Sequence, residues 1–551
     1  MNAITKGARR LSAFLVLILV VLVMGWSAVA LAQECQSDMG PRASVTLIYG
    51  GQNGGQRVVY TPSDSGALRA MDPANGRVLW TFTTEEAAVS GARGALMTDV
   101  RVLRFDANHD GTIDISSGDK VWLYFGTRRS GPFYYALDVT DRNVPRVLWK
   151  IGADVLKGAG EAWSTPTIAR VKVAGATQNG EHFVLIIGGG YAEAASPNGR
   201  RLFMVDAATG HLLWSAGGPT TAQNPGTPDL LLQHMTFPAP ARVAALDTDG
   251  DGFADRLYAA DLGGQIWRFD VWNGHARSSL VTGGVIASLG IAAQQAATGA
   301  PPGASPADEN DRRFFNAPDV ALIQRRNAES YYNVAIGSGD ALAPGSSRTH
   351  DRFYSIRDRS PFTQRAQSAY DAAPPILDAD LVDLTGFPPD VVIAPNAQGW
   401  KLDLRSSGAW LGEKVLAESL TANGAILFAT YQPSFAEGSP ACAVGGTARV
   451  YVLNLDTGNA VLDLNDDQQI DAADTSMPLS QPGIPGEISL QIGAITNDGG
   501  TPAPAEDPSG APGSQPAQES RTRCQVGAEI LSQCVPVDTA LRTFWQTPAI
   551  N

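Results

Sequence analysis

One phrase recurs along the chain: an apolar stretch in alternation, an aspartate, a turn with glycine, and a second apolar stretch that often holds tryptophan. The clearest copies cover residues 66–82, 134–151 and 201–216. Weaker copies lie at 265–274, 351–358, 399–412 and 448–464. Alternation with period two, joined by Asp, Asn and Gly turn residues, predicts a β-hairpin for each copy. The chain is therefore predicted to be all-β.

Hairpins repeated along a chain favour a β-propeller, because blades that close radially leave few exposed sheet edges. We expect few helices. Trp80, Trp149 and Trp214 hold the same place in their copies, so we expect them in the core or at docking contacts between blades. An array of β-sandwiches is the alternative, but it does not explain the shared Asp-turn-Trp phrase. Residues 292–313 and 498–520 are rich in Pro, Gly, Ala and Ser and are interpreted as flexible insertions.

The composition indicates a globular protein with a large core, since 44% of the 551 residues are hydrophobic and only 17% are charged. The net charge of −14 disfavours nucleic acid and anionic membrane surfaces as main partners, because both would repel the average surface.

Residues 1–32 are typical of a secretory signal, with early basic residues, an apolar run, and Ala30-Leu31-Ala32 as a cleavage site. An uncleaved anchor helix is the alternative, although the apolar run is short for a membrane span. No later stretch is long and apolar enough to cross a bilayer. We therefore expect an exported mature chain, 33–551, that forms one propeller domain without a transmembrane span.

All four cysteines follow the predicted cleavage site, so they would enter an oxidising compartment. Cys524 and Cys534 are close enough in sequence to pair, which would leave Cys35 and Cys442. Four cysteines allow three connectivities, and the sequence does not choose among them. A zinc site is disfavoured because no Cys-x-x-Cys spacing occurs.

Three acidic loops share one spacing, and the clearest is DTDGDGFAD at residues 247–255. Carboxylates at positions 1, 3, 5 and 9 of a tight loop converge hard oxygen ligands on one point, as Ca²⁺ requires. Gly250 and Gly252 permit the sharp bend. The predicted ligands are Asp247, Asp249, Asp251, the carbonyl of Phe253, and Asp255.

The other two loops are predicted calcium sites of the same kind. The ligands of the first are Asp106, Asn108, Asp110, the carbonyl of Thr112, and Asp114. The ligands of the other are Asp463, Asn465, Asp467, Gln469, Asp471 and Asp474. No persuasive pair of helices flanks any of the three, so we interpret them as EF-hand-like loops inserted in a β-protein, with a structural role first. A metal-free acidic turn is the alternative for each.

Signals for catalysis are weak. The six histidines show no paired spacing for zinc, no Gly-x-Ser-x-Gly occurs, and the glycine run 188–190 lacks the lysine of a phosphate loop. We interpret that run as a close-packed strand end. A quinoprotein-type dehydrogenase is an alternative function because its blades carry similar phrases, but the expected vicinal Cys pair and Cys-x-x-Cys-His site are absent from the sequence.

Several long segments of the chain resemble the PilC/PilY family of type IV pilus biogenesis proteins. These are the segments that begin at Lys120, Trp163, Phe237 and Phe314, with CAVGG at Cys442 and RTFWQ at Arg542. The resemblance implies a modified seven-bladed, quinoprotein-like propeller with an inserted calcium loop. Carried over by residue, the family's calcium ligands fall on Asp247, Asp249, Asp251, the carbonyl of Phe253, and Asp255.

For function, the resemblance implies an exported protein that is associated with pilus tips, the cell surface or the outer membrane. It would bind calcium, support pilus assembly and twitching motility, and oppose retraction without being an enzyme. The implied partners are minor pilins and the pilus machinery, with the outer-membrane secretin as a further candidate. The large adhesin region that longer members place before the propeller is not seen here, which leaves host adhesion in doubt. A periplasmic scaffold or carbohydrate-binding surface protein is a further alternative.

Overall fold

The computed structural model describes residues 44–535 except 51–54, 64–65, 91–96, 111–112, 176–180, 194–195, 221–225, 299–308, 325–328, 388–392, 406–407, 435–444, 494–520, 528 and 532. The predicted signal at 1–32, Cys35, Cys442, Thr112 and the predicted insertion at 498–520 lie outside the described residues, as does the RTFWQ segment.

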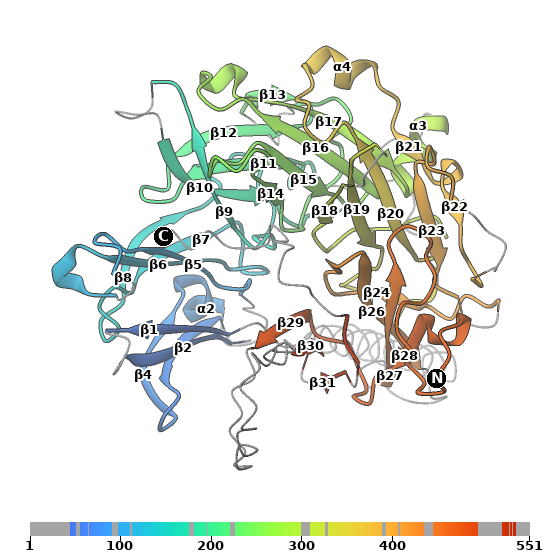
Figure 1. The fold of residues 1–551 in the computed structure, drawn as a ribbon. Coiled ribbons are helices and arrows are strands. Elements are labelled where there is room, and N and C mark those ends of the chain that lie inside the picture. Colours follow the sequence, from blue (N-terminus) through green and yellow to red (C-terminus); the bar gives the residue numbers. More distant parts are fainter. Residues whose placement is uncertain are drawn as a thin grey trace, which may run out of the picture.

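Seven sheets follow one another around a ring in chain order, which is a seven-bladed β-propeller (Figure 1). Blade 1 is β1 (Val45–Tyr49), β2 (Gln56–Pro62), β3 (Ala67–Asp72) and β4 (Arg77–Thr83). Blade 2 is β5 (Arg101–Phe105), β6 (Lys120–Gly126), β7 (Tyr134–Asp138) and β8 (Arg146–Ile151). The predicted all-β propeller is confirmed.

Blades 3 to 5 each add a short parallel strand at the outer edge. Blade 3 is β9 (Thr167–Lys172), β10 (Glu181–Gly188), β11 (Arg201–Asp206), β12 (Leu212–Gly217) and β13 (Leu230–Leu231). Blade 4 is β14 (Ala244–Leu246), β15 (Arg256–Ala260), β16 (Gln265–Val271), β17 (Val281–Ser288) and β21 (Ile376–Leu377). Blade 5 is β18 (Asp319–Ile323), β19 (Tyr331–Gly337), β20 (Arg352–Arg359), β23 (Gly399–Asp403) and β22 (Val382–Asp383).

The last two blades complete the ring. Blade 6 is β24 (Lys414–Val415), β26 (Ala425–Ser434), β27 (Gly445–Asn454) and β28 (Ser476–Pro478), with β25 (Leu420–Ala422) paired to β26. Blade 7 is β29 (Ile488–Gly493), β30 (Arg521–Val526) and β31 (Glu529–Ile530). The helices are α2 (Glu85–Ser90), α3 (Ile291–Thr298), α4 (Gln367–Ala372) and the 3₁₀ turns η1 (Ile115–Ser117), η2 (Arg277–Ser279), η3 (Asp378–Asp380) and η4 (Ala472–Thr475). Over the described residues, none of them has the length and apolar character of a membrane span.

The buried apolar clusters lie between consecutive blades, from blades 1 and 2 to blades 6 and 7. A blade with such a cluster on each side therefore buries both faces of its sheet, which explains why β16 of blade 4 is buried along its whole length. The ring owes its stability to these interfaces, since an isolated blade could not bury its apolar surface.

The three clear copies of the phrase fold into the same bulged hairpin. Met204 pairs with Trp214 and Val205 pairs with Leu212, so one residue between them has no partner across the hairpin. The hairpins of residues 67–83 and 134–151 shift register at the same place, one residue before Trp80 and Trp149. A bulge increases the local twist and re-aims the following side chain. The repeat thus specifies where each tryptophan points.

The tryptophans join neighbouring blades, as predicted. Trp80 Nε1 of blade 1 donates to the carbonyl of Arg142 in blade 2 at 2.9 Å. Trp149 Nε1 of blade 2 donates to the carbonyl of Ala207 in blade 3 at 3.0 Å. Trp214 instead contacts Phe269 of blade 4 edge-on, with 6.3 Å between ring centroids.

The structure bears on three other expectations, and it confirms the last of them. The weaker copies at 351–358 and 399–412 are not hairpins of their own; they supply β20 and β23, which pair with each other. In the expected insertion at 292–313, residues 292–298 belong to α3, and Arg312 is buried near Leu289, whose carbonyl accepts from the Arg312 Nε at 2.8 Å. The glycine run 188–190 is a close-packed strand end, since a Cβ on Gly189 would lie 2.1 Å from the Gly199 carbonyl oxygen.

Candidate metal centre

The loop 247–255 joins β14 to β15 at one end of blade 4. Carboxylate oxygens of Asp247, Asp249 and Asp255 lie within 4.8 Å of one another. Three anionic groups at this spacing repel unless a cation or a proton balances them. The loop therefore brings together three of the four predicted side-chain ligands.

Two glycines set the bend of this loop. Gly250 has φ of 83° and Gly252 has φ of 87°, a conformation that other residues adopt at a cost. The backbone N–H groups of both glycines donate to Asp247, at 2.7 Å each, one to either carboxylate oxygen. The backbone thus fixes the Asp247 carboxylate in place.

Asp251 and Phe253 hold the middle of the loop. Asp251 is not part of the three-carboxylate group, and its Oδ1 accepts from the Phe253 N–H at 2.9 Å. The Phe253 carbonyl accepts no hydrogen bond from any described residue, so its oxygen is available to a cation. The Phe253 ring is buried beneath the cations of Arg170 and Lys172, at 4.4 and 3.9 Å from the ring centroid. This ring anchors the loop of blade 4 on β9 of blade 3.

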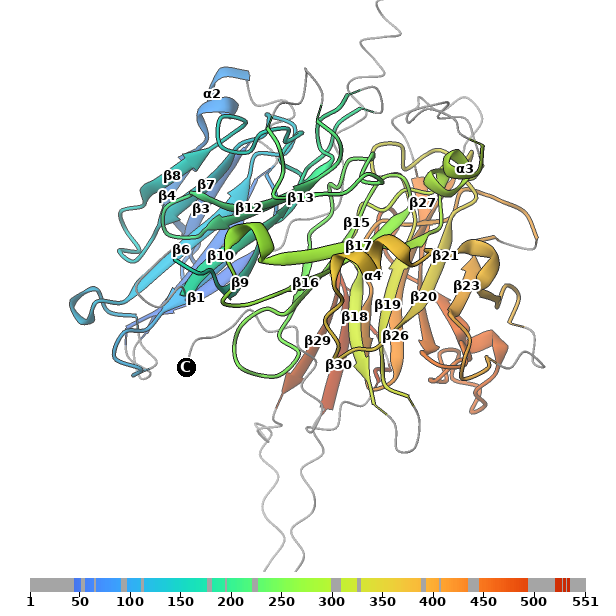
Figure 2. The ribbon, with the colours of Figure 1, turned by 90° about the horizontal axis from the view of Figure 1, so that it is seen from above.

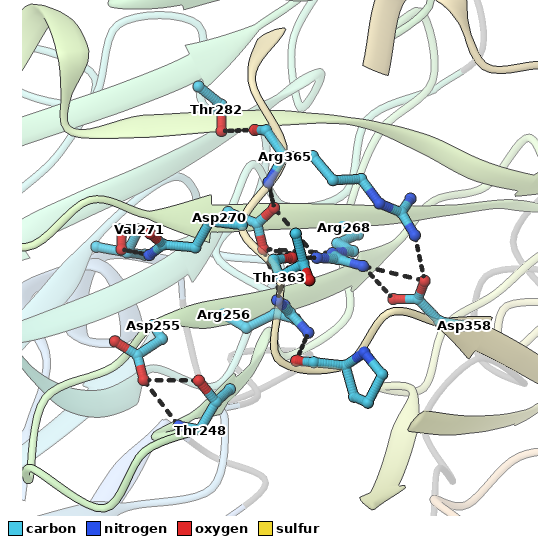
Figure 3. Close-up of polar contacts among 12 residues, drawn as sticks. Thr248, Asp255, Arg256, Arg268, Asp270, Val271, Thr282, Asp358, Thr363 and Arg365 are labelled. Carbon is cyan, nitrogen blue, oxygen red and sulfur yellow. Dashed lines mark hydrogen bonds and ion pairs between the residues drawn. The ribbon is translucent and has the colours of Figure 1, made fainter. Parts of the chain in front are cut away.

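Asp255 is the last candidate ligand of the loop and directly precedes β15. Its Oδ2 accepts from the N–H and hydroxyl of Thr248 at 2.8 and 2.9 Å (Figure 3). Burial, with the charges of Asp249 and Asp247, raises the pKa of Asp255 in spite of these hydrogen bonds. A group that binds a proton more readily for this reason would also gain from a bound cation.

The loop 463–474 follows β27 and forms a second group, in which oxygens of Asp463, Asp467 and Asp474 lie within 4.8 Å of one another. Asp474 is fully buried and accepts from the N–H groups of Leu464 and Asn465, at 2.9 and 3.1 Å. Asp471 lies outside this group and caps η4 through the Ala473 N–H at 2.7 Å. Asp474, at position 12 of this loop, therefore takes the place that Asp255, at position 9, has in the loop 247–255.

Both loops share one backbone course although only one has glycines. Positions 4 and 6 of the later loop are Asp466 and Gln468, with φ of 60° and 68°. Gly250 and Gly252 occupy the same positions in the loop 247–255. Asp463 accepts from the Gln468 N–H at 2.8 Å, which repeats the Asp247 contact with Gly252. The loop 463–474 has no turn glycine, and two non-glycine residues adopt the left-handed backbone conformation in its place, at a cost in strain.

The loop 106–114 differs in what its described residues bring together. His109, at position 4, has φ of 57°, so the backbone course begins in the same way. Its carboxylates do not form a three-membered group among the described residues; Asp110 accepts from Asn108 Nδ2 at 2.8 Å, and Asp114 caps η1. The placement of Thr112 is not described.

Asp119 is a functional candidate that the sequence reasoning missed. Its Oδ1 accepts from the Ala107 N–H at 2.8 Å and its Oδ2 from the Asp114 N–H at 2.7 Å. Asp474 bridges the matching positions of its own loop, through Leu464 and Asp471. A carboxylate after the 3₁₀ turn was the available signal, but it falls two residues later than the position where an EF-hand places its last ligand.

A buried network of charges adjoins the loop 247–255 (Figure 3). Arg256 and Arg268 both donate to Asp270, and these three side chains are at most 1% exposed. Arg268 Nη1 also donates to both oxygens of Asp358, at 3.1 and 3.0 Å. Buried charges are tolerated only when they are paired and hydrogen-bonded, and every member here meets that requirement.

A separate cavity of about 160 Å³ lies where the inner ends of six blades converge. Its lining includes Trp163, Arg242 and Glu418, and Arg242 donates to Glu418 from two nitrogens. Burial, with the charges of Glu418 and Asp99, raises the pKa of Glu487 in this cavity to about 7. The acidic loops are therefore distinct from the central cavity, where a propeller enzyme of the quinoprotein class would hold its cofactor.

Comparisons with known proteins agree on one kind of domain. Residues 108–350 match the family model described as the PilY1 beta-propeller domain. A type IV pilus biogenesis factor PilY1 homolog of Xylella fastidiosa is 29% identical over 367 residues, which is 62% of this chain and 22% of that protein. PilY1 of Pseudomonas aeruginosa PAO1 is 25% identical over 414 residues, 68% of this chain and 33% of that protein. The chain thus spans a third or less of the length of these relatives.

A solved structure gives the same fold. The crystal structure of the Pseudomonas aeruginosa PilY1 C-terminal domain matches with a TM-score of 0.56 at 20% identity, and the match covers 86% of this chain and 92% of that one.

Proposed function

The propeller of this chain belongs to the PilY1 family, and from that premise we propose that the protein is a type IV pilus biogenesis factor whose propeller binds calcium at the loop 247–255. The single observation that carries the metal proposal is the convergence of Asp247, Asp249 and Asp255 within 4.8 Å. Calcium prefers clustered carboxylate and carbonyl oxygens in a flexible shell of six to eight ligands, and these residues with the Phe253 carbonyl supply such a set.

The donor chemistry of this loop fits calcium better than a transition metal. All candidate ligands are oxygens, and no described histidine or cysteine belongs to the group. The Asp247, Asp249, Asp251 and Asp255 carboxylates would take the ion with the Phe253 carbonyl. The loop 463–474 is proposed as a second site on the same grounds. The loop 106–114 is proposed as a third, with Asp119 as the residue that holds its ends together.

A bound ion would stiffen a loop that connects two blades. The loop belongs to blade 4, while the Ala254 N–H donates to the carbonyl of Arg170 in blade 3 at 2.8 Å, and the Phe253 ring packs against the same strand. Neutralising three carboxylates would stiffen this seam, because a metal-free loop is loosened by its own repulsion. We propose that the stiffened seam presents a surface to the pilus machinery.

The proposed activity is binding and not catalysis. The protein would be exported to the periplasm, outer membrane or cell surface. There it would support pilus assembly and oppose retraction through contacts with minor pilins, and with the secretin as a further candidate partner. The net charge of −14 agrees with protein partners and with divalent cations more than with nucleic acid.

The proposal is tested in the source organism by replacing the chromosomal copy with the Asp247→Asn, Asp249→Asn double variant. We expect fewer surface pili and reduced twitching. Deleting the retraction motor in the same strain should restore pili if the protein opposes retraction, and should not restore them if the protein acts only in assembly. Asp154→Asn, an exposed aspartate of the loop after β8, is the matched control. Unchanged piliation and motility in the double variant would overturn the proposal.

A further inference from the structure

The segment 360–373, which we call the strap, leaves β20 of blade 5 and crosses to β17 of blade 4. Figure 2 shows α4, the helical part of the strap, beside β17. Thr282 of β17 donates to the carbonyl of Arg365 at 2.7 Å, and Gln367 donates to the carbonyl of Gly283 at 2.9 Å. The strap is therefore fixed at its middle and at its helix.

The start of the strap is held by the buried network. Arg256 donates to the carbonyls of Pro361 and Thr363, and Arg268 also donates to Thr363, at 2.6 Å. The Arg365 N–H donates to Asp270 at 2.8 Å, and Tyr370 OH donates to the same carboxylate at 2.7 Å. Moving this segment away would leave buried charged groups without these partners, which is costly, so the network fixes its position.

A pocket of about 140 Å³ lies between the strap, β17 and β20. One part of its lining is apolar and includes Val285, Ile286, Ile356 and Ile376, with the ring of Tyr370. The rest is polar and consists of Arg357, Asp358 and Arg359 of β20 with Arg365 and the exposed Gln398, so three arginines face one carboxylate. The volume suits one aliphatic side chain of medium size, and the two kinds of lining would select a ligand with an apolar and a polar end.

The polar side of this pocket has a surplus of positive charge. The network holds three guanidinium groups, of Arg256, Arg268 and Arg365, against two carboxylates, of Asp270 and Asp358. Arginine stays protonated at any ordinary pH, so the surplus is permanent. An anion bound at the rim would balance it.

Arg365 is the member of the network that can meet such an anion. Its side chain is 26% exposed, whereas that of Asp358 beside it is 3% exposed. Its Nη2 donates to Asp358 at 2.9 Å and to the carbonyl of Arg359 at 3.0 Å. Among the described residues, its Nε and Nη1 donate to no acceptor, so the one N–H of Nε and the two of Nη1 remain available to a ligand.

We propose that this pocket binds the C-terminal residue of a partner protein, with the carboxylate on Arg365 and an aliphatic side chain on the apolar lining. A C-terminal residue carries its carboxylate and its side chain on one carbon atom, so a single residue satisfies both sides of a pocket of this size. An aspartate or glutamate side chain supplies the carboxylate alone. Guanidinium–carboxylate contacts are among the stronger hydrogen-bonded pairs in proteins.

The test uses N-acetyl-L-leucine as the probe and measures binding to the mature chain by NMR titration. N-acetyl-L-leucinamide lacks the carboxylate and N-acetylglycine lacks the aliphatic group. We expect the acid to bind about tenfold more tightly than the amide, because only the acid forms a charge-assisted hydrogen bond with Arg365, and more tightly than N-acetylglycine. Each titration is run with and without calcium, so that failure of the calcium proposal leaves this test intact.

Two variants test whether the probe binds in this pocket. Arg365→Gln should weaken binding of the acid about tenfold and leave the amide unchanged, while Arg69→Gln, an exposed arginine on β3, should change neither. Equal binding of acid and amide, or no saturable binding of the acid, would overturn the proposal even if Arg365→Gln folds poorly, because both are measured on the unmodified protein. A glutamate with blocked termini that binds as tightly as N-acetyl-L-leucine would also overturn it.

Discussion

Arg256, the residue that follows Asp255, donates from Nε to Oδ1 of Asp270 at 2.8 Å, and neither side chain is more than 1% exposed. The proposed metal loop is therefore one residue away from a buried ion pair that also holds the strap. The backbone strengthens this relationship, since the Val271 N–H donates to the Asp255 carbonyl at 2.7 Å. The loop, the strand ends and the strap form one connected unit of blade 4.

Removing one partner of this pair should strongly reduce stability. Arg256→Met leaves Asp270 with less compensation, and we expect a loss of about 3–5 kcal/mol in the free energy of unfolding. The control is Arg277→Met, because Arg277 also pairs with an aspartate, donating from two nitrogens to Asp229, while its side chain is 48% exposed. That control should lose about 1 kcal/mol or less. Urea denaturation measures both, and equal losses would show that burial does not decide the strength of the pair.

Backbone strain in the acidic loops predicts opposite changes in stability for two variants. Gly252→Ala places a Cβ 3.3 Å from Arg170 Nη1 at φ of 87°, and we expect a loss of about 1 kcal/mol or more. Gln468→Gly removes strain at φ of 68°, and we expect a gain of up to about 1 kcal/mol. Both are measured by denaturation in EDTA, so that ion binding does not contribute. A loss in both variants would mean that Gln468 makes a contact worth more than its strain.

The protein should become less stable as the pH rises, because buried carboxyl groups then lose their protons. Burial raises the pKa of Asp319 from 3.8 to about 7; its Oδ1 has no hydrogen-bond partner in the described part of the chain, and its Oδ2 accepts from Thr421 at 2.6 Å. The folded state thus binds the proton more tightly than the unfolded state. The contribution to stability is present at low pH and is lost between about pH 4 and about pH 7.

Asp319→Asn removes this ionisation while keeping the shape of the side chain. We expect its melting temperature to exceed that of the unmodified protein at about pH 8 and to depend less on pH. Asp371→Asn, which changes an exposed aspartate of α4, should keep the original slope. Identical slopes for Asp319→Asn and the unmodified protein, measured by thermal denaturation, would assign the pH dependence to other groups such as Glu487.

The disulfide between Cys524 and Cys534 should stabilise the loop 463–474. Gln533, next to Cys534, donates from Nε2 to Asp466 Oδ1 at 3.0 Å, so the cross-linked hairpin contacts this loop. Replacing both cysteines with alanine should cost about 2–3 kcal/mol. Hydrogen exchange should increase in the loop 463–474 and remain unchanged in the loop 247–255. Uniform exchange changes in both loops would contradict the local link.

The fold was accessible from the sequence because its signal is local. The repeated phrase carries the strand alternation, the turn residues and the tryptophan, and the structure places the shared bulge immediately before Trp80, Trp149 and Trp214. The sequence allowed three connectivities of the four cysteines, and the structure shows that Cys524 pairs with Cys534. The four weaker copies each contain one strand, β16, β20, β23 or β27, and the strands that pair with it lie outside the copy.

The site was accessible only in part because its remaining members come from distant segments. The spacing of acidic residues predicted Asp247, Asp249 and Asp255 together, but it could not show that Asp251 would turn to the Phe253 N–H. Asp119 follows its loop at an unexpected distance. Arg268 contacts Asp358 across 90 residues, and no local pattern specifies a contact of that kind.

The central claim is tested most directly by calcium titration of the mature chain, comparing the unmodified protein with the Asp247→Asn, Asp249→Asn double variant by isothermal titration calorimetry. We predict that the unmodified protein binds calcium and that the double variant binds one ion fewer per chain, while Asp154→Asn binds as many as the unmodified protein. An unchanged number of bound ions in the double variant would contradict the assignment of a calcium site to the loop 247–255.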